Sequence, residues 1–175
     1  MWYPVALAQP QWPTNPDIVV FKRSMSEKSL ARAGETVAIA SDHAGVELKA
    51  VLMDELAGLG FKVLDLGPAT ADSVDYPDYG HALARSISDG RARAGVAICG
   101  SGIGISIAVN RHPGLRAALV SDEATAKLAR QHNDANVLAL GARSTPPDQA
   151  RKLVRAFFEA EFEGGRHARR VEKLG

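Results

Sequence analysis

The chain has 175 residues, of which 46% are hydrophobic and 23% are charged, with a formal net charge of +1. This composition is typical of one soluble globular domain and excludes a largely disordered chain. The balanced charge gives no overall attraction to nucleic acid or to an anionic membrane surface, so any anion site must be local. Cys99 is the single cysteine, which excludes an internal disulfide and favours a reducing cytoplasm.

Residues 1–34 differ from the rest, and we expect them to form a mobile, proline-rich N-terminal extension to a domain at 35–175. The start lacks a basic region, and its apolar residues 5–8 are too few for a signal sequence or a membrane span. Either Met25 is the true initiator, or the tryptophans of the extension pack on a partner. The distinguishing residues are Trp2, Trp12, Pro4, Pro10, Pro13 and Pro16.

From Thr36 onward, short apolar runs alternate with longer amphipathic runs. This pattern predicts an α/β fold, a Rossmann-like three-layer sandwich with a five-stranded parallel sheet. In chain order the expected elements are a strand at 37–41, a helix at 45–59, a strand at 62–66, a helix at 77–89, a strand at 95–99, a helix at 103–110, a strand at 116–120, a helix at 122–131, a strand at 136–140 and a helix at 146–163.

The last of these helices has the best-defined start. Thr145 is expected to supply the N-cap hydroxyl, Pro146 to take the first helical position and Asp148 to complement the helix dipole. The apolar stripe of this helix would face the sheet or another subunit. The stripe consists of Leu153, Val154, Phe157, Phe158 and Phe162.

Polar residues follow four of the expected strands. In open parallel sheets, ligands bind outside the carboxyl ends of the strands, so these residues indicate a binding site at that edge. They are the segments 41–43 (Ser-Asp-His), 99–101 (Cys-Gly-Ser), 121–122 (Ser-Asp) and 141–143 (Gly-Ala-Arg).

The third expected strand runs directly into Cys99 and the glycine-rich turn 100–104. Such a turn before a helix leaves backbone N–H groups unpaired, and their field would stabilise a thiolate or bind an anion. An ordinary thiol is only roughly 3% ionised at neutral pH, so this stabilisation would suit a base or a nucleophile. The alternative is that Cys99 is a small core residue and the glycines only allow close packing.

Two further segments carry groups suited to chemistry. Asp42 and His43 end the first strand, where they could bind a polyol or position a proton; alternatively, Asp42 only caps a helix. His132 could act as an acid or base near neutral pH, with Asn133 bound to a hydroxyl. Alternatively, His132 complements a helix dipole and Asn133 ends the helix.

Arg166 and Arg170, four residues apart, would lie on one side of a helical turn, where two guanidinium groups suit a phosphate. The alternative is a solvated basic tail. Nucleic-acid binding is disfavoured because no aromatic residues are interleaved with basic ones. The chain lacks a nucleotide P-loop ending, and its dispersed histidines predict no metal site. These histidines are His43, His81, His112, His132 and His167.

Taken together, five motifs resemble the ribose-5-phosphate isomerase B family, in the same order and spacing, over residues 36–174. They are SDHAG (41–45), DYPDY (75–79), ICGSGIGIS (98–106), RQHNDANVLALGAR (130–143) and EGGRHARRVEKL (163–174). The family also contains isomerases of galactose 6-phosphate and allose 6-phosphate. The resemblance therefore implies a phosphorylated aldose as substrate, a Rossmann-like homodimer or dimer of dimers with active sites shared between subunits, and no cofactor or metal.

The resemblance also implies roles for individual residues. Cys99 matches the family's proton-transfer base and His132 matches the acid that opens the sugar ring. Asp42, His43 and Asn133 match further substrate contacts. The loop around the substrate oxygens matches Gly100, Ser101, Gly102, Ile103 and Gly104, and the arginine positions, with phosphate as their expected target, match Arg143, Arg166 and Arg170.

These roles predict a cytoplasmic aldose–ketose isomerase that interconverts ribose 5-phosphate and ribulose 5-phosphate by ring opening and a cis-enediol proton transfer. The alternatives are an isomerase of a hexose 6-phosphate and a catalytically silent sugar-phosphate-binding protein. A nucleotide-binding regulatory module is a third class, but its motifs are missing. The proline-rich extension departs from the family pattern and leaves the true N-terminus open.

Overall fold

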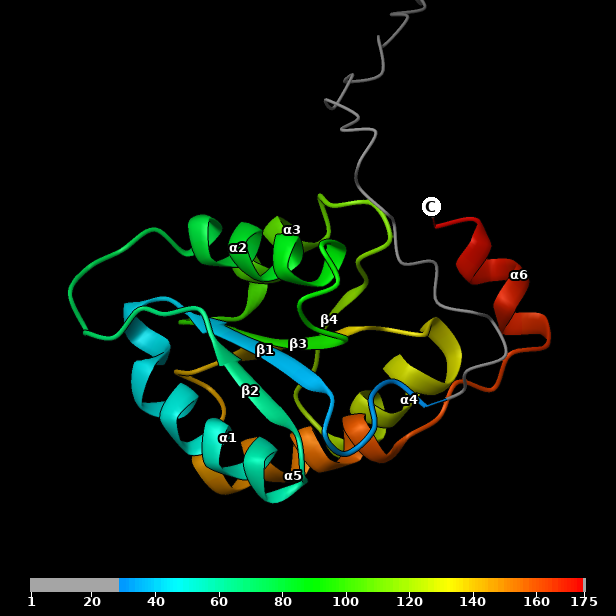
Figure 1. Ribbon diagram of the computed structural model, residues 1–175, viewed down its shortest axis with the longest axis horizontal. Helices are drawn as coiled ribbons and strands as arrows, with labels where there is room; N and C mark the ends of the chain where they lie inside the picture. The colour runs from blue at the N-terminus through cyan, green and yellow to red at the C-terminus, as the bar shows by residue number, and fades with distance from the viewer. Residues whose placement is uncertain (1–28, 175) are drawn as a thin grey trace, which may run out of the picture.

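The computed structural model describes residues 29–174, which form a five-stranded parallel sheet with strand order β2-β1-β3-β5-β4 (Figure 1). Met25 and the tryptophans and prolines that mark the N-terminal extension lie outside these residues. The elements are β1 (Thr36–Ser41), the 3-10 turn η1 (His43–Gly45), α1 (Val46–Gly58), β2 (Lys62–Asp65), α2 (Tyr76–Ser88), β3 (Ala94–Cys99), α3 (Ile103–Val109), β4 (Ala117–Leu119), α4 (Glu123–Asn133), β5 (Val137–Gly141), α5 (Pro147–Glu159) and α6 (Arg166–Glu172).

Helices cover both faces of the sheet. Figure 1 shows α2 and α3 on one face and α1, α4 and α5 on the other. Because side chains alternate along a strand, Ile39 packs with Phe157 in the core on the α5 side, whereas Ala40 packs with Leu83 in the core on the α2 side. The expected three-layer α/β sandwich with a five-stranded parallel sheet is therefore confirmed.

The central strands β1 and β3 are direct neighbours, with Ser41 paired to Ile98 at their carboxyl ends. After β1 the chain turns to the edge strand β2, whereas after β3 it moves to the opposite side of the sheet, where β5 and β4 lie. The two connections leave neighbouring strand ends in opposite directions. This is the position at which open α/β sheets bind ligands.

The C-terminal region differs from expectation. Thr145 does not cap α5: it is buried, Pro146 takes the N-cap position, and no side chain caps the helix. The helix also ends at Glu159, four residues early, and a separate helix α6 follows. The helix stops where Ala160 takes an extended conformation, with φ −79° and ψ 140°. Gly164 and Gly165, with positive φ angles of 66° and 54°, then precede the separate helix α6.

The packed domain includes residues that the sequence assigned to the N-terminal extension. Leu30 is 1% exposed and Ala31 9% exposed, and both belong to the core on the α5 side of the sheet. Ser29 donates a hydrogen bond from its Oγ to Glu161 at 3.2 Å. Among the described residues, no helix is long and apolar enough to span a membrane.

Candidate active site

The loop after β3 is built around Cys99. The Cys99 side chain is a free thiol, 3% exposed, and its sulfur accepts a hydrogen bond from the Gly102 N–H at 3.1 Å. The thiolate is the form of cysteine that acts as a base or a nucleophile, and this N–H is positioned to bind its sulfur. The structure therefore combines the two interpretations of the sequence: Cys99 is buried, and its sulfur faces the turn.

One position in this turn requires glycine, and a second is packed closely against an aromatic ring. At Gly102, where φ is +76°, a Cβ atom would lie 2.5 Å from Leu119 Cδ1 and 2.7 Å from the carbonyl carbon of Leu140. At Gly104 it would lie 2.5 Å from the ring of Tyr76. Contacts this short force neighbouring atoms to move, so the close packing fixes the shape of the turn.

The turn offers fewer open N–H groups than its sequence suggests. Gly102 donates to Cys99, the Ile103 N–H donates to Ser101 Oγ at 3.3 Å, and the Gly100 N–H donates to Asp42 Oδ2 at 3.3 Å. Of the five N–H groups in 100–104, only those of Ser101 and Gly104 have no hydrogen-bond partner within residues 29–174. These two are the donors open to a substrate oxygen.

Asp42 joins β1 to this turn. Its side chain is 6% exposed, and Oδ1 accepts the N–H groups of Ala44 at 2.9 Å and Gly45 at 3.2 Å, which makes Asp42 the cap of η1. The bond from Gly100 to Oδ2 crosses the point between β1 and β3 where the chain directions diverge. The capping interpretation of Asp42 is therefore confirmed, and Asp42 also lies beside the Cys99 loop.

His43 and Arg143 complete this group. His43 Nδ1 lies 3.3 Å from both the backbone N and the backbone O of Val74, so the segment before α2 holds the imidazole. The Arg143 guanidinium lies over the turn, with Cζ 3.0 Å from where a Cβ on Gly100 would be. We call this group the carboxyl-edge cluster; it consists of Asp42, His43, Cys99, Gly100, Ser101, Gly102, Ile103, Gly104 and Arg143.

Lys49 supports the segment that holds His43, although no motif in the sequence identified it as a site residue. Its ammonium group is buried and donates to Asp65 Oδ1 at 2.6 Å and to the Pro68 carbonyl at 2.8 Å. The same Asp65 oxygen accepts the Gly67 N–H at 2.9 Å. A buried lysine needs such partners, and here they fix the start of the connection from β2 to α2.

The other predicted residues lie at the opposite edge of the sheet. His132 and Asn133 are the last two residues of α4, and Arg116 Nε, immediately before β4, donates to the Asn133 carbonyl at 3.1 Å. The Glu163 N–H donates to the Gln131 carbonyl at 3.0 Å and thereby holds the chain before α6 against α4. We call His132, Asn133, Glu163, Arg166, His167 and Arg170 the amino-edge cluster.

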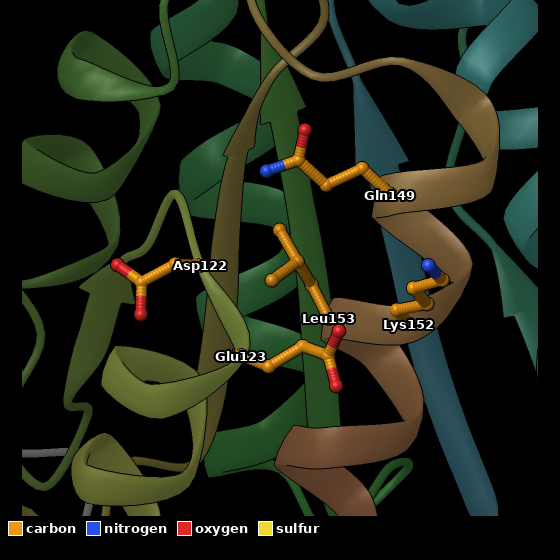
Figure 2. A pocket seen from close by; sticks show the side chains of 5 residues that line it. All are labelled: Asp122, Glu123, Gln149, Lys152 and Leu153. Atoms are coloured by element: carbon orange, nitrogen blue, oxygen red, sulfur yellow. The ribbon is translucent and has the colours of Figure 1, made fainter.

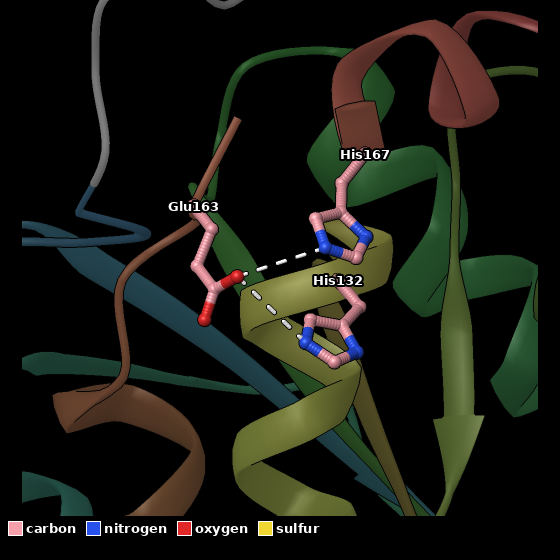
Figure 3. A group of neighbouring side chains, drawn as sticks. All are labelled: His132, Glu163 and His167. Atoms are coloured by element: carbon pink, nitrogen blue, oxygen red, sulfur yellow. Dashed lines mark ion pairs between the residues drawn. The ribbon is translucent and has the colours of Figure 1, made fainter. Parts of the chain in front are cut away.

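Glu163 and His167 belong to this cluster, although the sequence did not identify them as site residues. The His132 and His167 rings are stacked with centroids 4.2 Å apart and an interplanar angle of 6°. Glu163 Oε2 lies 3.8 Å from His132 Nε2 and 3.6 Å from His167 Nε2 (Figure 3). The four-residue spacing of Glu163 and His167 was the available signal, whereas the approach of His132 depends on tertiary packing.

The histidines are therefore not dispersed, contrary to the expectation from sequence. His81 Nδ1 lies 2.8 Å from His112 Nε2, and the ligand atoms of His132, Glu163 and His167 lie within 4.8 Å of one another. Two imidazoles and a carboxylate are donors that Zn²⁺ accepts.

Positive charge around His132, Glu163 and His167 disfavours the binding of a cation. Arg166 Nε donates to His167 Nε2 at 3.3 Å, on the nitrogen that an ion would have to occupy. Burial lowers the pKa of His167, and the charges of His132, Arg166 and Arg170 lower it further, despite the opposing effect of Glu163. Because two arginines lie close to this imidazole, the cluster favours an anion over a metal ion.

One chain does not bring the two clusters together. Cys99 ends β3, whereas Asn136, three residues after Asn133, accepts the Gly95 N–H at the beginning of that strand. Four residue steps from Gly95 to Cys99, at roughly 3.3 Å each, span about 13 Å along the strand. Figure 1 shows the same separation: β1 leads into α1 at one end of the sheet, and α4 and α6 lie toward the other.

A pocket between the beginnings of α4 and α5 contains, of the predicted site residues, only Asp122 from the segment 121–122 (Figure 2). The Asp122 carboxylate caps α4 by accepting the Thr125 N–H at 2.8 Å, and this bond lowers the pKa of Asp122. With two carboxylates and one lysine, this pocket is poorly suited to a phosphate. Its lining residues are Asp122, Glu123, Gln149, Lys152 and Leu153.

Known proteins resemble most of the chain. The family model described as "Ribose/Galactose Isomerase" matches residues 37–174. A Mycoplasma pneumoniae protein named "Probable ribose-5-phosphate isomerase B" is 47% identical over 137 residues, which cover 78% of this chain and 90% of the relative. A Pectobacterium atrosepticum protein named "D-erythrulose-4-phosphate isomerase" is 41% identical, covering 80% and 93%.

Solved structures give the same result. The structure of ribose 5-phosphate isomerase B from Anaplasma phagocytophilum is 51% identical to this chain and superposes with a TM-score of 0.77, covering 83% of this chain and 99% of that one. The match spans the motifs that suggested the family and both clusters of polar residues. The chain belongs to the ribose/galactose isomerase family.

Proposed function

We propose that this protein is an aldose–ketose isomerase that interconverts ribose 5-phosphate and ribulose 5-phosphate. The observation that carries the proposal is the buried Cys99 thiol, with the Gly102 N–H on its sulfur, at the divergence point between β1 and β3. This arrangement supplies a base beside oxygen-binding N–H groups. The names of the relatives from Mycoplasma pneumoniae and Anaplasma phagocytophilum support the choice of substrate.

In the proposed reaction, the Cys99 thiolate removes the proton on C2 of the open-chain aldose. The electron pair moves to form the C1–C2 double bond, and the carbonyl oxygen gains negative charge in a cis-enediol intermediate. The N–H groups of Ser101 and Gly104 bind this oxygen. Return of the proton to C1, with loss of the O2 hydroxyl proton to O1, gives the ketose. Removing one such N–H donor typically costs about 3 to 4 kcal/mol in the barrier.

A cyclic sugar must open before this step. We assign His132 as the acid that protonates the ring oxygen while the bond from C1 to that oxygen breaks. Asp42 accepts the proton of the anomeric hydroxyl, so that the two transfers leave an aldehyde. Within residues 29–174, Asp42 Oδ2 accepts only the Gly100 N–H and thus retains a lone pair for this hydroxyl.

Because His132 and Cys99 lie at opposite edges of one chain, we propose that the active site forms between two copies. The carboxyl-edge cluster of one copy would face the amino-edge cluster of the other. An apolar patch near the carboxyl-edge cluster supports such an interface. Its side chains, with exposed fractions of 41–54%, are Tyr76, Ile103, Ile107 and Leu119.

We assign the phosphate to the arginines of this shared site. Arg166 and Arg170 are exposed and lie one turn apart on α6, and Arg143 would approach from the other copy. Phosphate far from the reacting carbons lets binding energy orient C1 and C2. His43 and Asn133 are assigned to sugar hydroxyls. The reaction needs a reduced thiol, which favours the cytoplasm, and residues 1–34 are assigned no part in it.

The test is the rate of conversion of ribose 5-phosphate to ribulose 5-phosphate by the full chain in the presence of EDTA, with Cys99→Ala as control. Activity that is lost in the variant supports the isomerase and the base together. If the wild type does not convert ribose 5-phosphate but converts a hexose 6-phosphate or a tetrose 4-phosphate, the proposed substrate is wrong. If the wild type binds these sugars but converts none of them and does not exchange the C2 proton, the proposal that the protein is an isomerase is wrong.

A further inference from the structure

His167 stands out because it is a buried imidazole in contact with a residue of the proposed site. Its side chain is 7% exposed, whereas that of His132 is 36% exposed. The two rings are nearly parallel, with centroids 4.2 Å apart, and come from different helices, α6 and α4. The buried ring therefore forms a platform on which the more exposed ring lies (Figure 3).

The contacts of His167 indicate which of the two stacked rings is neutral and which can carry the additional proton. Arg166 Nε donates to His167 Nε2 at 3.3 Å, so this nitrogen acts as an acceptor and carries no proton. Burial lowers the pKa of His167, as do the charges of His132, Arg166 and Arg170. Two protonated imidazoles at this distance would repel each other. His167 is thus the neutral member, and His132 is the member that can carry a proton to the substrate.

Glu163 provides the matching negative charge. Its Oε2 lies to one side of both rings, 3.8 Å from Nε2 of His132 and 3.6 Å from Nε2 of His167. This carboxylate places a negative charge beside both rings and fixes which edge of the His132 ring faces it. The second ring nitrogen of His132, Nδ1, has no hydrogen-bond partner in the described part of the chain and is left for the sugar.

We propose that His167 is a positioning residue: it contacts both the ring-opening acid His132 and the phosphate-binding Arg166 and so fixes their relative position. Glu163 provides the negative charge beside the two imidazoles. The proposal rests on the function proposed above and deepens it. Arg166 uses Nε for His167 and keeps both Nη groups for a phosphate. A phosphate bound there is thereby connected through His167 to the ring of His132. Binding the phosphate and aligning the acid become one event.

Two substitutions of His167 separate its contacts. His167→Asn keeps an acceptor for Arg166 but removes the platform, and His167→Phe keeps a platform but removes the acceptor. Glu163→Gln removes only the negative charge. Glu172→Gln, at the other end of α6, is the matched control because it removes the same charge away from the stacked rings.

Turnover of the cyclic aldose and proton exchange in the open-chain ketose distinguish ring opening from proton transfer. Ribose 5-phosphate enters as a closed ring, whereas ribulose 5-phosphate has no free C5 hydroxyl with which to close a five-membered ring. We expect His167→Asn and Glu163→Gln to lower kcat from ribose 5-phosphate roughly tenfold or more. Exchange of the C1 proton of ribulose 5-phosphate with solvent, which needs the proton transfer but no ring step, should change less than about twofold. His167→Phe should keep kcat and raise KM. Glu172→Gln should match the wild type.

Solution NMR supplies a readout that does not depend on turnover. The His132 ring protons should show a ring-current shift that is lost in His167→Asn and kept in His167→Phe. Equal losses of turnover from ribose 5-phosphate and of C1 proton exchange in ribulose 5-phosphate for His167→Asn and Glu163→Gln would overturn the positioning role while leaving the isomerase intact. Wild-type kinetics and an unchanged ring-current shift in His167→Asn would do the same. A wild type inactive in both directions would instead overturn the proposed function, and this role with it.

Discussion

The two polar clusters of this protein are built in different ways. The carboxyl-edge cluster is shaped by main chain: Cys99 is buried, its sulfur is bound by a backbone N–H, and Gly102 fits only as glycine. The amino-edge cluster is made from side chains of α4, α6 and the segment before α6, most of them partly or fully exposed. Rigid main chain suits a proton transfer between adjacent carbons, whereas side chains on a short helix suit capture of a phosphate and a closed ring.

The largest effect should come from removing the base in the main-chain cluster. Cys99→Ala should lower the isomerisation rate by about 10³-fold or more, because a positioned general base contributes 10² to 10⁴. Exchange of the C2 proton with solvent, followed by NMR, measures the step directly. Affinity for the sugar phosphate should remain within a few-fold. Retained exchange in this variant would assign the base elsewhere.

The second prediction tests the tight turn. Gly102→Ala places a methyl group 2.5 Å from Leu119 and 2.7 Å from backbone, at a φ of +76°. We expect a loss of about 2 to 4 kcal/mol in the free energy of unfolding, together with loss of activity. Urea denaturation measures the loss.

Gly114→Ala is the matched control for the turn. Gly114 has the same φ, +76°, but a Cβ there meets nothing within 4 Å, so the substitution should cost about 1 kcal/mol and keep activity. The difference between the two variants isolates the close packing of Gly102 from its backbone strain. Equal costs would show that the shape of the turn does not depend on that packing.

A smaller effect is expected at the side-chain cluster. Arg166→Ala and Arg170→Ala should each raise KM for the sugar phosphate about tenfold or more, since a charged hydrogen bond contributes about 1.5 to 3 kcal/mol. Arg169→Ala, an exposed neighbour on the same helix, is the control and should change KM little. Calorimetry with the substrate or a phosphorylated analogue separates binding from turnover. Unchanged affinity in both variants would remove these arginines from the phosphate site.

The smallest effect concerns pH. Burial, together with the charges of His132 and Arg166, lowers the pKa of His167 below its ordinary value of 6.5. The unfolded chain therefore binds this proton more readily than the folded chain, and the associated stability is complete above about pH 6.5 and falls as the pH drops below it. The melting temperature of the wild type should fall more than that of His167→Phe between pH 7.5 and 5.5. Parallel curves would contradict this effect.

The same contrast explains what the sequence could predict. The strands, the Cys99 loop and the polar residues after β1 and β3 follow from local patterns, because apolar runs, glycines and strand ends are contiguous in the chain. The stacking of His167 on His132 could not be predicted this way, because the two residues are 35 positions apart and meet only through the packing of α6 on α4. The motif EGGRH drew attention to this segment, but only the tertiary fold shows that its imidazole, that of His167, lies against His132.

The errors in the expected elements have a similar origin. Thr145 has the right residue type for an N-cap, yet its backbone N–H binds the Gly141 carbonyl at 3.0 Å and its side chain is buried. The turn that follows β5 therefore holds Thr145 in a position where it cannot act as the N-cap, despite its local propensity to do so. Leu30 likewise follows a part of the sequence that is rich in proline, but it is buried in the core on the α5 side of the sheet.

The placement of Cys99 and His132 at opposite ends of one sheet has a consequence for mixed assemblies. If two copies form two shared sites, a chain lacking Cys99 and a chain lacking His132 are each inactive alone. Joined in one dimer, they leave one site with both residues intact and one with neither. Random exchange of subunits between the two inactive proteins should therefore restore about a quarter of the wild-type activity. The catalytic unit is then defined by the boundary between chains rather than by either chain.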